Sequence, residues 1–557
     1  MAEWSTPHTF VNEVDDGLGH RIPIAGADPY LLWGIVNEGR GLQVIPSTGG
    51  AEEPPAGLET CTPDRFAKPA NYLQVLIEVT TGLADHADED ARRIESLEDH
   101  LDVSRGGLRL RGVFTRNEKS GRKRLVKPCR FVTGLVADWW LFCFLERIPS
   151  GCVRWEIGHA RSAVKIGEHT SVPEPAGGGW SKDDKLLDGN VMVIIDYGCP
   201  FAHPQFRSPK GSRVRYVWFQ GQDAVSAGAP LSPVRYFGSK RSLFPYGREL
   251  RGSDIDQLIA SHTGVEGCDE SACYESIGYE LMREASTHGG HVMSIACGSP
   301  NPLAKEIGEE WLFGSGAGHF ATSSVPGDDE AAEAEIIFIE LPRAAVGDSS
   351  GGSMNVHLVD ALHYVLARTK PSARITVNCS MGTHAGPHDG SSMLEQAIDD
   401  VSNRRYPAQF SMVVPVGNAF NSACHAFREV SPDVRMDVSV DIPADKSTPT
   451  LIELWYPRSL NALPVAVSDL GVELVAPDGS HLRAPAGHQV TTWSLSQQPG
   501  GGCCRGGTGW LCNRYFAPCT LGHRADRRAS GGAIVVDRSL RLLAVIGGFN
   551  PCSRCAS

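Results

Sequence analysis

Three short stretches of this 557-residue chain carry side chains that could move protons or stabilise an oxyanion. The run "VMVIID" ends on the carboxylate of Asp196, "STHGGHVM" places His288 at the start of a predicted helix, and "VVPVGN" ends on Asn418. The amino end of a helix disfavours an imidazolium, so His288 is expected to serve as a base. A side-chain amide such as that of Asn418 can donate to a developing oxyanion. Each residue also has a purely structural alternative, because Asp and Asn occur in turns and His can cap a helix.

Small residues follow His288 in the stretch "HGGHVMSIACG". Gly289, Gly290 and Ser294 would allow this helix to approach its neighbours closely. We therefore expect the glycines to aim His288 into a cleft. The second histidine, His291, is expected to be a packing residue at the helix start.

The elements that must position these side chains are predicted helices and strands that alternate along the chain. Helical patterns at 356–369 and 391–404 alternate with apolar, β-branched runs, which are typical of strands buried on both faces. This alternation predicts an α/β fold with a doubly wound, mostly parallel sheet, in which active groups gather at the carboxyl ends of the strands. The predicted strands are "VMVIID" (191–196), "EIIFIEL" (335–341), "RITVNCS" (374–380) and "FSMVVPVG" (410–417).

Four units are expected along the chain. Residues 1–179 predict a small N-terminal α+β module, with strands at 72–82 and within 129–160, a helix at 88–101 and a Pro/Gly-rich linker at 171–184. The α/β unit follows at 186–426. Residues 430–495 alternate polar and apolar positions, which predicts a β-rich insertion. The tail, 499–557, is atypical, because from residue 501 onward it holds eight Arg, two Asp, no Lys and no Glu.

The bulk composition excludes several classes of protein. A formal net charge of −13 argues against nucleic acid or an anionic membrane as a partner. The start "MAEWSTPHTF" lacks the features of a signal peptide, and no apolar run reaches the roughly 18 residues that a membrane span requires. The expected location is therefore cytoplasmic. Ten of the 16 cysteines are scattered singly along the chain and predict buried thiols rather than disulfides.

The order of these motifs on one α/β sheet resembles that of the subtilisin-like serine peptidases, the subtilases. "IIDYGCPFAHP" is similar to the family's Asp motif, "HGGHVMS" to its His motif, "NCSMG" (378–382) to its substrate-cleft strand and "PVGN" to its oxyanion turn. The His motif departs from the family at Gly290, where Thr is usual, and at Met293-Ser294, where Ala-Gly is usual. The resemblance covers residues 186–426, and the position of the first unit resembles that of an inhibitor-type prodomain.

The resemblance implies a serine endopeptidase that hydrolyses peptide bonds of a peptide or protein substrate. A serine would attack the scissile carbonyl, His288 would take its proton, and Asp196 would hold the imidazole in the productive tautomer. Asn418 would help to bind the oxyanion. The substrate would lie against the segment Ser380, Met381 and Gly382.

The nucleophilic serine of the family motif "G-T-S-M-A-x-P" is not identifiable in this chain. "GGTGW" (506–510) has Gly where Ser is needed, and Ser530 in "RRASGGA" lacks the flanking residues. "GDSSGG" (347–352) is interpreted as a loop and "GSS" (390–392) as a helix N-cap. One hypothesis is that the chain ends before the serine helix, with "LRLLAVIGGFNP" (540–551) as the strand and turn that precede it. The others are a nucleophile hidden in the tail and an inactive member of the family that binds peptides.

No cofactor is expected, and no metal site. "CSRC" (552–555) has the spacing of a zinc ligand pair but no second pair to complete the site, and no loop is assigned to calcium. The sequence leaves the oligomeric state and the peptide specificity open. The long segment 207–282, between the Asp and His motifs, is expected to build cleft walls or a lid.

Overall fold

The computed structural model describes residues 186–221, 234, 244, 246–265, 267–283, 287–299, 330–346, 352–386, 388, 390, 392–404, 409–422 and 424–426 in the middle of the chain. Outside this part it describes residue 130 and the strands named below. The predicted helix at 88–101 and the linker at 171–184 lie outside the described residues. None of the helices in the described part of the chain is both long enough and apolar enough to cross a membrane.

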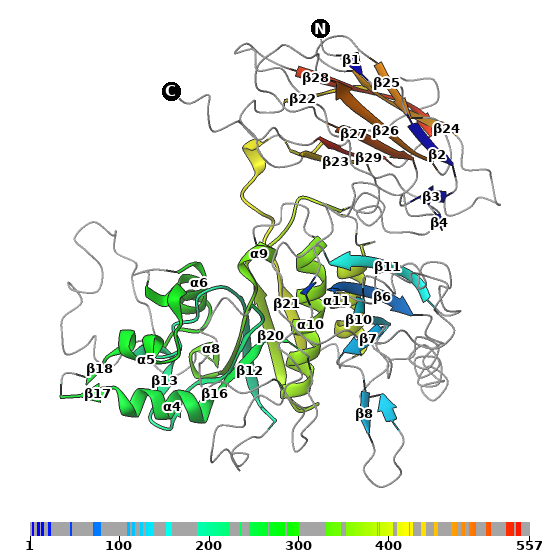
Figure 1. Cartoon of the computed structure of the whole chain (residues 1–557). Helices are drawn as coiled ribbons and strands as arrows, with labels where there is room; N and C mark the ends of the chain where they lie inside the picture. The colour runs from blue at the N-terminus through cyan, green and yellow to red at the C-terminus, as the bar shows by residue number, and fades with distance from the viewer. Residues whose placement is uncertain are drawn as a thin grey trace, which may run out of the picture.

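The centre of the molecule is a mixed α/β unit built on a six-stranded, mostly parallel sheet, in the order β16-β15-β19-β12-β20-β21 (Figure 1). All strands pair in parallel except β16, which runs antiparallel to β15 at one edge. The four strands predicted from apolar runs are present as β12 (Asn190–Asp196), β19 (Glu335–Glu340), β20 (Arg374–Cys379) and β21 (Phe410–Val413). Strand β12 lies between β19 and β20, which explains why its residues are almost all apolar.

The segment 207–282 was expected to form cleft walls or a lid, but part of it belongs to the central sheet instead. Strands β15 (Val214–Phe219) and β16 (Arg248–Arg251) are part of the central sheet. The sequence of β15, "VRYVWF", is itself a β-branched and aromatic run, and nearly every residue in it is buried. The other described residues of the segment include β13 (Arg207–Ser208), β14 (Gly211–Ser212), α4 (Gly252–Ser261), β17 (Thr263–Gly264), β18 (Gly267–Cys268), α5 (Glu270–Ser276) and the start of η3 (Glu280–Arg283).

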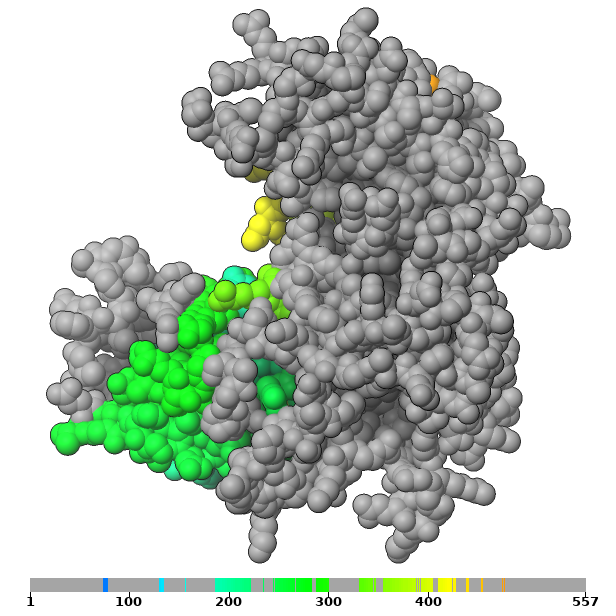
Figure 2. Space-filling view, in the orientation of Figure 1, coloured from blue at the N-terminus to red at the C-terminus, as the bar shows by residue number. Residues whose placement is uncertain are grey.

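Helices pack on both faces of the sheet (Figure 1). Alternate side chains of β15 contact the helices on the two faces of the sheet, because successive side chains of a strand point to opposite faces. Val217 and Phe219 belong to a core with Met293 of α6 (His288–Cys297). Trp218 instead stacks on Tyr364 of α10 (Gly352–Arg368), with ring centroids 4.8 Å apart. Residues 246–265 and 267–283 together with α6, all drawn in green, form one flank of the molecule (Figure 2).

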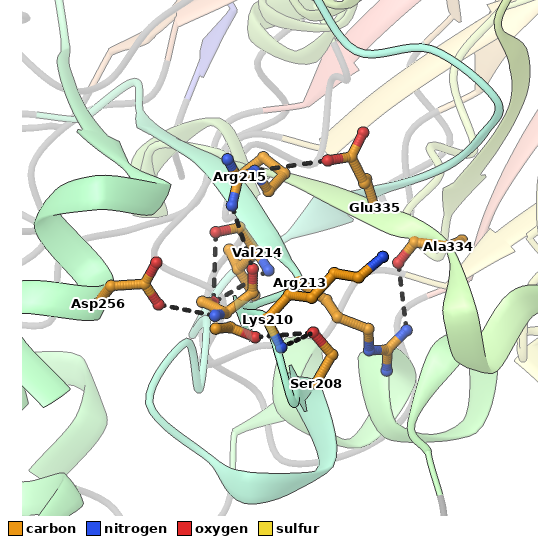
Figure 3. A network of polar contacts seen from close by, with 10 residues as sticks. Ser208, Lys210, Arg213, Val214, Arg215, Asp256, Ala334 and Glu335 are labelled. Atoms are coloured by element: carbon orange, nitrogen blue, oxygen red, sulfur yellow. Dashed lines mark hydrogen bonds and ion pairs between the residues drawn. The ribbon is translucent and has the colours of Figure 1, made fainter. Parts of the chain in front are cut away.

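Helix α6 begins at His288, as predicted, and is held at both ends. Thr287 is its N-cap, and the hydroxyl of Thr287 accepts a hydrogen bond from the amide of Gly290 (3.1 Å). At the other end the buried guanidinium of Arg213 donates to the carbonyl of Cys297. Arg213 also donates to the carbonyl of Ala334 (3.2 Å), beside the helical turn α8 (Glu330–Glu333) (Figure 3). One cation therefore ties the carboxyl end of α6 to the start of β19.

Helix α11 (Met393–Arg404) begins with a capping box. The hydroxyl of Ser392 accepts from the amide of Glu395 (3.1 Å), and the carboxylate of Glu395 accepts from the amide of Ser392 (3.0 Å). The interpretation of "GSS" as a helix cap is therefore confirmed. Between β19 and α10 the chain forms a short helix, α9 (Arg343–Val346), while residues 347–351 of "GDSSGG" lie outside the described part.

The N-terminal region contributes an antiparallel sheet in the order β11-β6-β10-β7, with β5 paired to β6. Its inner face lies on α10 and α11, where Leu76 and Phe131 join a buried cluster with Val356, Val359, Met393 and Ala397. Polar contacts supplement the cluster, since the Thr133 hydroxyl donates to Asp360 and the Arg130 amide donates to Asp400 (3.1 Å). The strands are β5 (Ile45–Pro46), β6 (Asn71–Val79), β7 (Leu108–Arg111), β10 (Phe131–Ala137) and β11 (Cys152–Gly158).

Six further short strands precede the α/β unit in the described part of the chain. Two pairs form separate hairpins, β3 (Glu13–Asp15) with β4 (Arg21–Pro23) and β8 (Phe114–Arg116) with β9 (Lys123–Leu125). The other pair, β1 (Glu3–Trp4) and β2 (His8–Val11), joins β26 (Gln489–Ser496) near the other end of the chain.

The C-terminal region forms two antiparallel sheets, β22-β28-β24-β25 and β1-β26-β27-β29-β23 (Figure 1). Strand β29 (Leu542–Ile546), the described part of the stretch 540–551, pairs with β27 and β23 here and not with a strand of the central sheet. The antiparallel partners on both sides of β29 use its backbone hydrogen bonds. The other strands are β22 (Met436–Asp441), β23 (Thr450–Leu454), β24 (Asp469–Val475), β25 (His481–Ala484), β27 (Thr508–Asn513) and β28 (Gly531–Ser539).

The close approach of α6 to the end of β12 depends on Gly289. A Cβ atom at this position would lie 2.4 Å from the carbonyl oxygen of Tyr197, which is backbone and cannot rotate away. We predict that Gly289→Ala lowers the local stability of α6 by about 1–3 kcal/mol. Native-state hydrogen exchange of the α6 amides measures this change. Gly264→Ala, at an exposed site with no atom within 4 Å, is the control and should change stability by less than about 0.5 kcal/mol.

Candidate active site

Asp196 is the last residue of β12 and is fully buried. Its Oδ1 atom accepts a hydrogen bond from the amide of Tyr197 (2.8 Å) and lies 2.7 Å from Nδ1 of His288. In the sheet register Asp196 stands opposite Glu340 of β19, and its neighbour Ile195 stands opposite Cys379 of β20. The predicted carboxylate therefore lies at the carboxyl end of a central strand, where ligands of open α/β sheets bind.

His288 is the first residue of α6 and contacts Asp196 across 92 positions of sequence. An ionised carboxylate can only accept, so Nδ1 of His288 is the donor, and in the neutral ring this leaves the lone pair on Nε2. The ring stacks on Tyr197 at a centroid distance of 5.6 Å and an interplanar angle of 14°. The His288 side chain is 44% exposed, whereas its partner is buried. This arrangement places a base at the surface and its orienting carboxylate beneath it.

The electrostatics of Asp196 reflect competing effects. Burial raises the pKa of the Asp196 carboxyl, and the hydrogen bonds from His288 and Tyr197 offset part of this rise. Among the described residues its second oxygen, Oδ2, has no hydrogen-bond partner. Ionised Asp196 therefore depends on the groups at Oδ1 for most of its stabilisation.

The thiols beside this carboxylate are poor nucleophiles. Burial, together with the charge of Asp196, raises the pKa of Cys379 to about 12. Burial and the charge of Glu340 likewise raise the pKa of Cys199 well above its usual range. Both side chains therefore stay protonated near neutral pH.

The two histidines of the "HGGHV" stretch lie three residues apart and both are exposed. The prediction that His291 packs in the helix start is therefore wrong. Residues at this spacing lie on the same side of a helix, and the core is filled from the other side by Met293 and Cys297. His291 is a neighbour of His288 on the surface and has no contact with Asp196 in the described part of the chain.

Asn418 lies in the turn that follows β21, and its side chain is exposed. The preceding Gly417 has a φ of 84°, the left-handed conformation that favours glycine. Strand β21 is parallel to β20, so the turn opens at the same edge of the sheet as Asp196. No hydrogen bond joins Asn418 to Asp196 or His288 within the described residues, and its role as an oxyanion donor stays a prediction.

The predicted substrate segment directly follows β20. Ser380 and Met381 are half-buried and Gly382 is exposed. The side-chain amide of Asn378 donates to the hydroxyl of Ser380 (2.9 Å), which holds the start of the segment against the strand. Because β20 is the neighbour of β12, this segment lies at the same sheet edge as Asp196. Substrate binding by these residues stays a prediction.

No serine, threonine or cysteine side chain is hydrogen-bonded to His288 among the residues that the structure describes. Ser392 of the "GSS" stretch instead caps α11. Ser530 lies outside the described residues. In the same described part, no group of three or more His, Cys, Asp or Glu side chains could hold a metal ion.

Sequence reasoning missed two buried polar residues next to the site, Glu340 and Tyr279. The signal for Glu340 was available, because "EIIFIE" ends on a carboxylate just as "VMVIID" ends on Asp196. Two apolar strands that both end on an acid, and that the fold places side by side, mark one polar sheet edge. Tyr279 carries no such signal, since its proximity to Glu340 arises only from the folding of segment 207–282.

No family profile and no curated protein matches the chain. Among solved structures, the chain is similar to the CspB protease of Clostridium perfringens, with 16% identity, a TM-score of 0.39 and coverage of 68% of this chain and 67% of that protein. At this identity and TM-score the likeness establishes neither a shared fold nor a shared activity.

The raised pKa of Asp196 predicts how an amide would behave in its place. Asp196→Asn removes the burial penalty of the charge, so at pH 7 its urea-unfolding midpoint should equal or exceed that of the wild type. As pH falls through the raised pKa, the folded wild type takes up a proton and gains stability, so the variant's advantage should shrink. A marked loss of stability in Asp196→Asn at pH 7 would show that the charge is needed for folding itself.

Proposed function

We propose that this protein is a serine-type endopeptidase of the subtilase kind, in which Asp196 and His288 form the proton-transfer pair. The observation that carries the proposal is the 2.7 Å contact between Nδ1 of His288 and the buried carboxylate of Asp196. The pair lies at the carboxyl edge of a mostly parallel sheet, and the imidazole is open to solvent. A doubly wound, subtilisin-like topology for residues 186–426 is part of the same proposal.

In this mechanism Nε2 of His288 takes the proton of an attacking serine hydroxyl and later returns it to the leaving amine. Asp196 holds the ring in the Nδ1–H tautomer and stabilises the imidazolium that forms. Asn418 donates its amide to the oxyanion, which is worth roughly 3–4 kcal/mol of transition-state stabilisation in enzymes of this type. The substrate backbone lies along Ser380, Met381 and Gly382. The serine itself is not assigned to a residue.

A second candidate function is peptide binding without hydrolysis. It is favoured by one specific observation, that no hydroxyl or thiol among the described residues is hydrogen-bonded to His288. A binding role needs the cleft but neither member of the Asp196–His288 pair. The two functions therefore differ in whether the pair matters.

The N-terminal antiparallel sheet is proposed as a separate module seated on α10 and α11. The contacts that support this division are the cluster around Leu76 and Phe131 and the hydrogen bond from Thr133 to Asp360. An inhibitor-type role for this module follows only from the resemblance of its position. The limits 1–179, 186–426, 430–495 and 499–557 are likewise proposals.

A fluorophosphonate probe, which labels an activated serine, tests the proposed function. We predict that the full-length protein is labelled and that His288→Ala slows labelling by about 10²–10⁴-fold, because the general base is lost. His291→Ala is the matched control, since His291 lies on the same exposed side of α6 but does not contact Asp196. It should leave the labelling rate unchanged.

Absence of labelling in the intact protein would contradict the endopeptidase proposal. The binding alternative would then predict that the double variant Asp196→Ala and His288→Ala still binds peptides. Loss of binding in that double variant, with the fold intact, would contradict the alternative as well.

A further inference from the structure

The three residues that follow Asp196, which we call the 197–199 turn, link β12 to the base of the site. On one side this turn is bound to α6. The amide of Gly289 donates to the carbonyl of Tyr197 (2.9 Å), and the hydroxyl of Thr287 donates to the carbonyl of Gly198 (2.9 Å). Gly198 has a φ of 85°, and a Cβ atom there would collide with Thr287. The carbonyls of the turn therefore face α6 at close range.

On its other side the turn is bound by a pair of buried side chains. Glu340 accepts a hydrogen bond from the amide of Gly198 (3.1 Å) and another from the hydroxyl of Tyr279. The same hydroxyl accepts from the amide of Cys199 (2.8 Å). Glu340 and Tyr279 are 2% and 1% exposed, respectively. The two consecutive amides of the turn are thus held by one carboxylate–phenol pair.

The chemistry of Glu340 and Tyr279 fixes the direction of the hydrogen bonds that they make. We call these two side chains the clamp. Burial and the charge of Glu340 raise the pKa of Tyr279 well above its usual range, so the phenol keeps its proton and donates it to Glu340. A buried carboxylate is stabilised only where its hydrogen bonds are made in good geometry, which restricts where Gly198 can lie. Tyr279 comes from segment 207–282, whereas Glu340 ends β19, so the clamp joins two distant parts of the chain.

We propose that Glu340 and Tyr279 are positioning residues for His288. By fixing the amides of Gly198 and Cys199, they hold the 197–199 turn against α6 and thereby set the contact between Asp196 and His288. The same constraint keeps the Tyr197 ring stacked on the imidazole. This inference rests on the proposed function in one respect, namely that the Asp196–His288 pair transfers protons.

The pair also gives segment 207–282 a role that its sequence does not suggest. Tyr279 precedes η3 and packs by its edge on Phe219 of the central sheet, with ring centroids 5.0 Å apart. The phenol is thereby held by the core at its ring and by the turn at its hydroxyl. Correct folding of this segment is therefore a condition for the geometry of the site.

Tyr279→Phe tests the inference with two readouts. The first is the low-field proton NMR signal of the His288 Nδ1–H, assigned by its absence in His288→Ala, which reports the hydrogen bond to Asp196 without requiring activity. The second is the rate of fluorophosphonate labelling. We expect Tyr279→Phe to broaden or abolish the NMR signal and to slow labelling by about 10- to 100-fold, because misplacing a catalytic group by about 1 Å can cost about 100-fold in rate.

Tyr274→Phe is the matched control. Tyr274 is a second buried tyrosine of the same segment, its ring lies 6.3 Å from that of Tyr279, and its hydroxyl donates to Glu270 (3.2 Å) rather than to the turn. This variant should keep the NMR signal and the labelling rate of the wild type. Equal losses in the two variants would show that any buried phenol of the segment matters, and would overturn the inference.

Glu340→Gln supplies the test if Tyr279→Phe does not fold. Both hydrogen bonds end on the same carboxylate oxygen, Oε2, so the neutral amide oxygen of Gln can accept them only without the charge that strengthens them, and the NMR signal should weaken. Because the two residues act as a unit, the double variant should lose no more than the worse single variant. Additive losses would contradict a shared clamp.

The two proposals fail separately. An unlabelled wild type with a low-field signal that disappears in Tyr279→Phe would overturn the endopeptidase function and leave the positioning role standing. A labelled wild type whose signal and rate survive in folded Tyr279→Phe and Glu340→Gln would overturn the positioning role alone.

Discussion

The hydrogen bond between the buried carboxylate of Asp196 and the imidazole of His288 is the interaction on which the described site depends. A carboxylate that is buried away from water needs hydrogen-bond donors. For Asp196 these donors are the next amide along the chain and a side chain 92 positions away. The contact joins the end of β12 to the start of α6. Every feature that fixes those two ends therefore also fixes the site.

The groups that fix the end of β12 and the start of α6 are polar, although the core around them is apolar. Thr287 and Gly289 bind the turn after Asp196 from the α6 side, and Glu340 and Tyr279 bind it from the β19 side. Farther away, Arg213 holds the carboxyl end of α6. Hydrogen bonds are directional and apolar packing is not, so this division lets the core stabilise the sheet while the polar groups set orientation.

On the opposite face of the sheet, buried polar groups also set the orientation of the packed elements. Helix α10 turns charged and polar side chains inward, where Arg368 pairs with the buried Glu249 of β16 (2.7 Å). On the same helix, Asp360 accepts a hydrogen bond from the hydroxyl of Tyr246 (2.5 Å) and another from the hydroxyl of Thr133 in the N-terminal sheet. Burial lowers the pKa of the neighbouring His363, which favours its neutral form in this core. Helix α10 thus connects the central sheet to the N-terminal sheet through paired polar groups as well as apolar contacts.

Local pattern determined much of this architecture. Each of the apolar runs at 191–196, 335–341, 374–380 and 410–417 contributes a strand to one sheet, the start of α6 lies at His288, and Ser392 caps α11. Such features depend on residues close together in the chain, so periodicity and capping rules can predict them. Tertiary structure decided the rest. It brought segment 207–282 into the sheet as β15 and β16, exposed His291 and paired β29 with β27. It also placed Tyr279 against Glu340, because contacts between distant segments arise from packing, which no local pattern records.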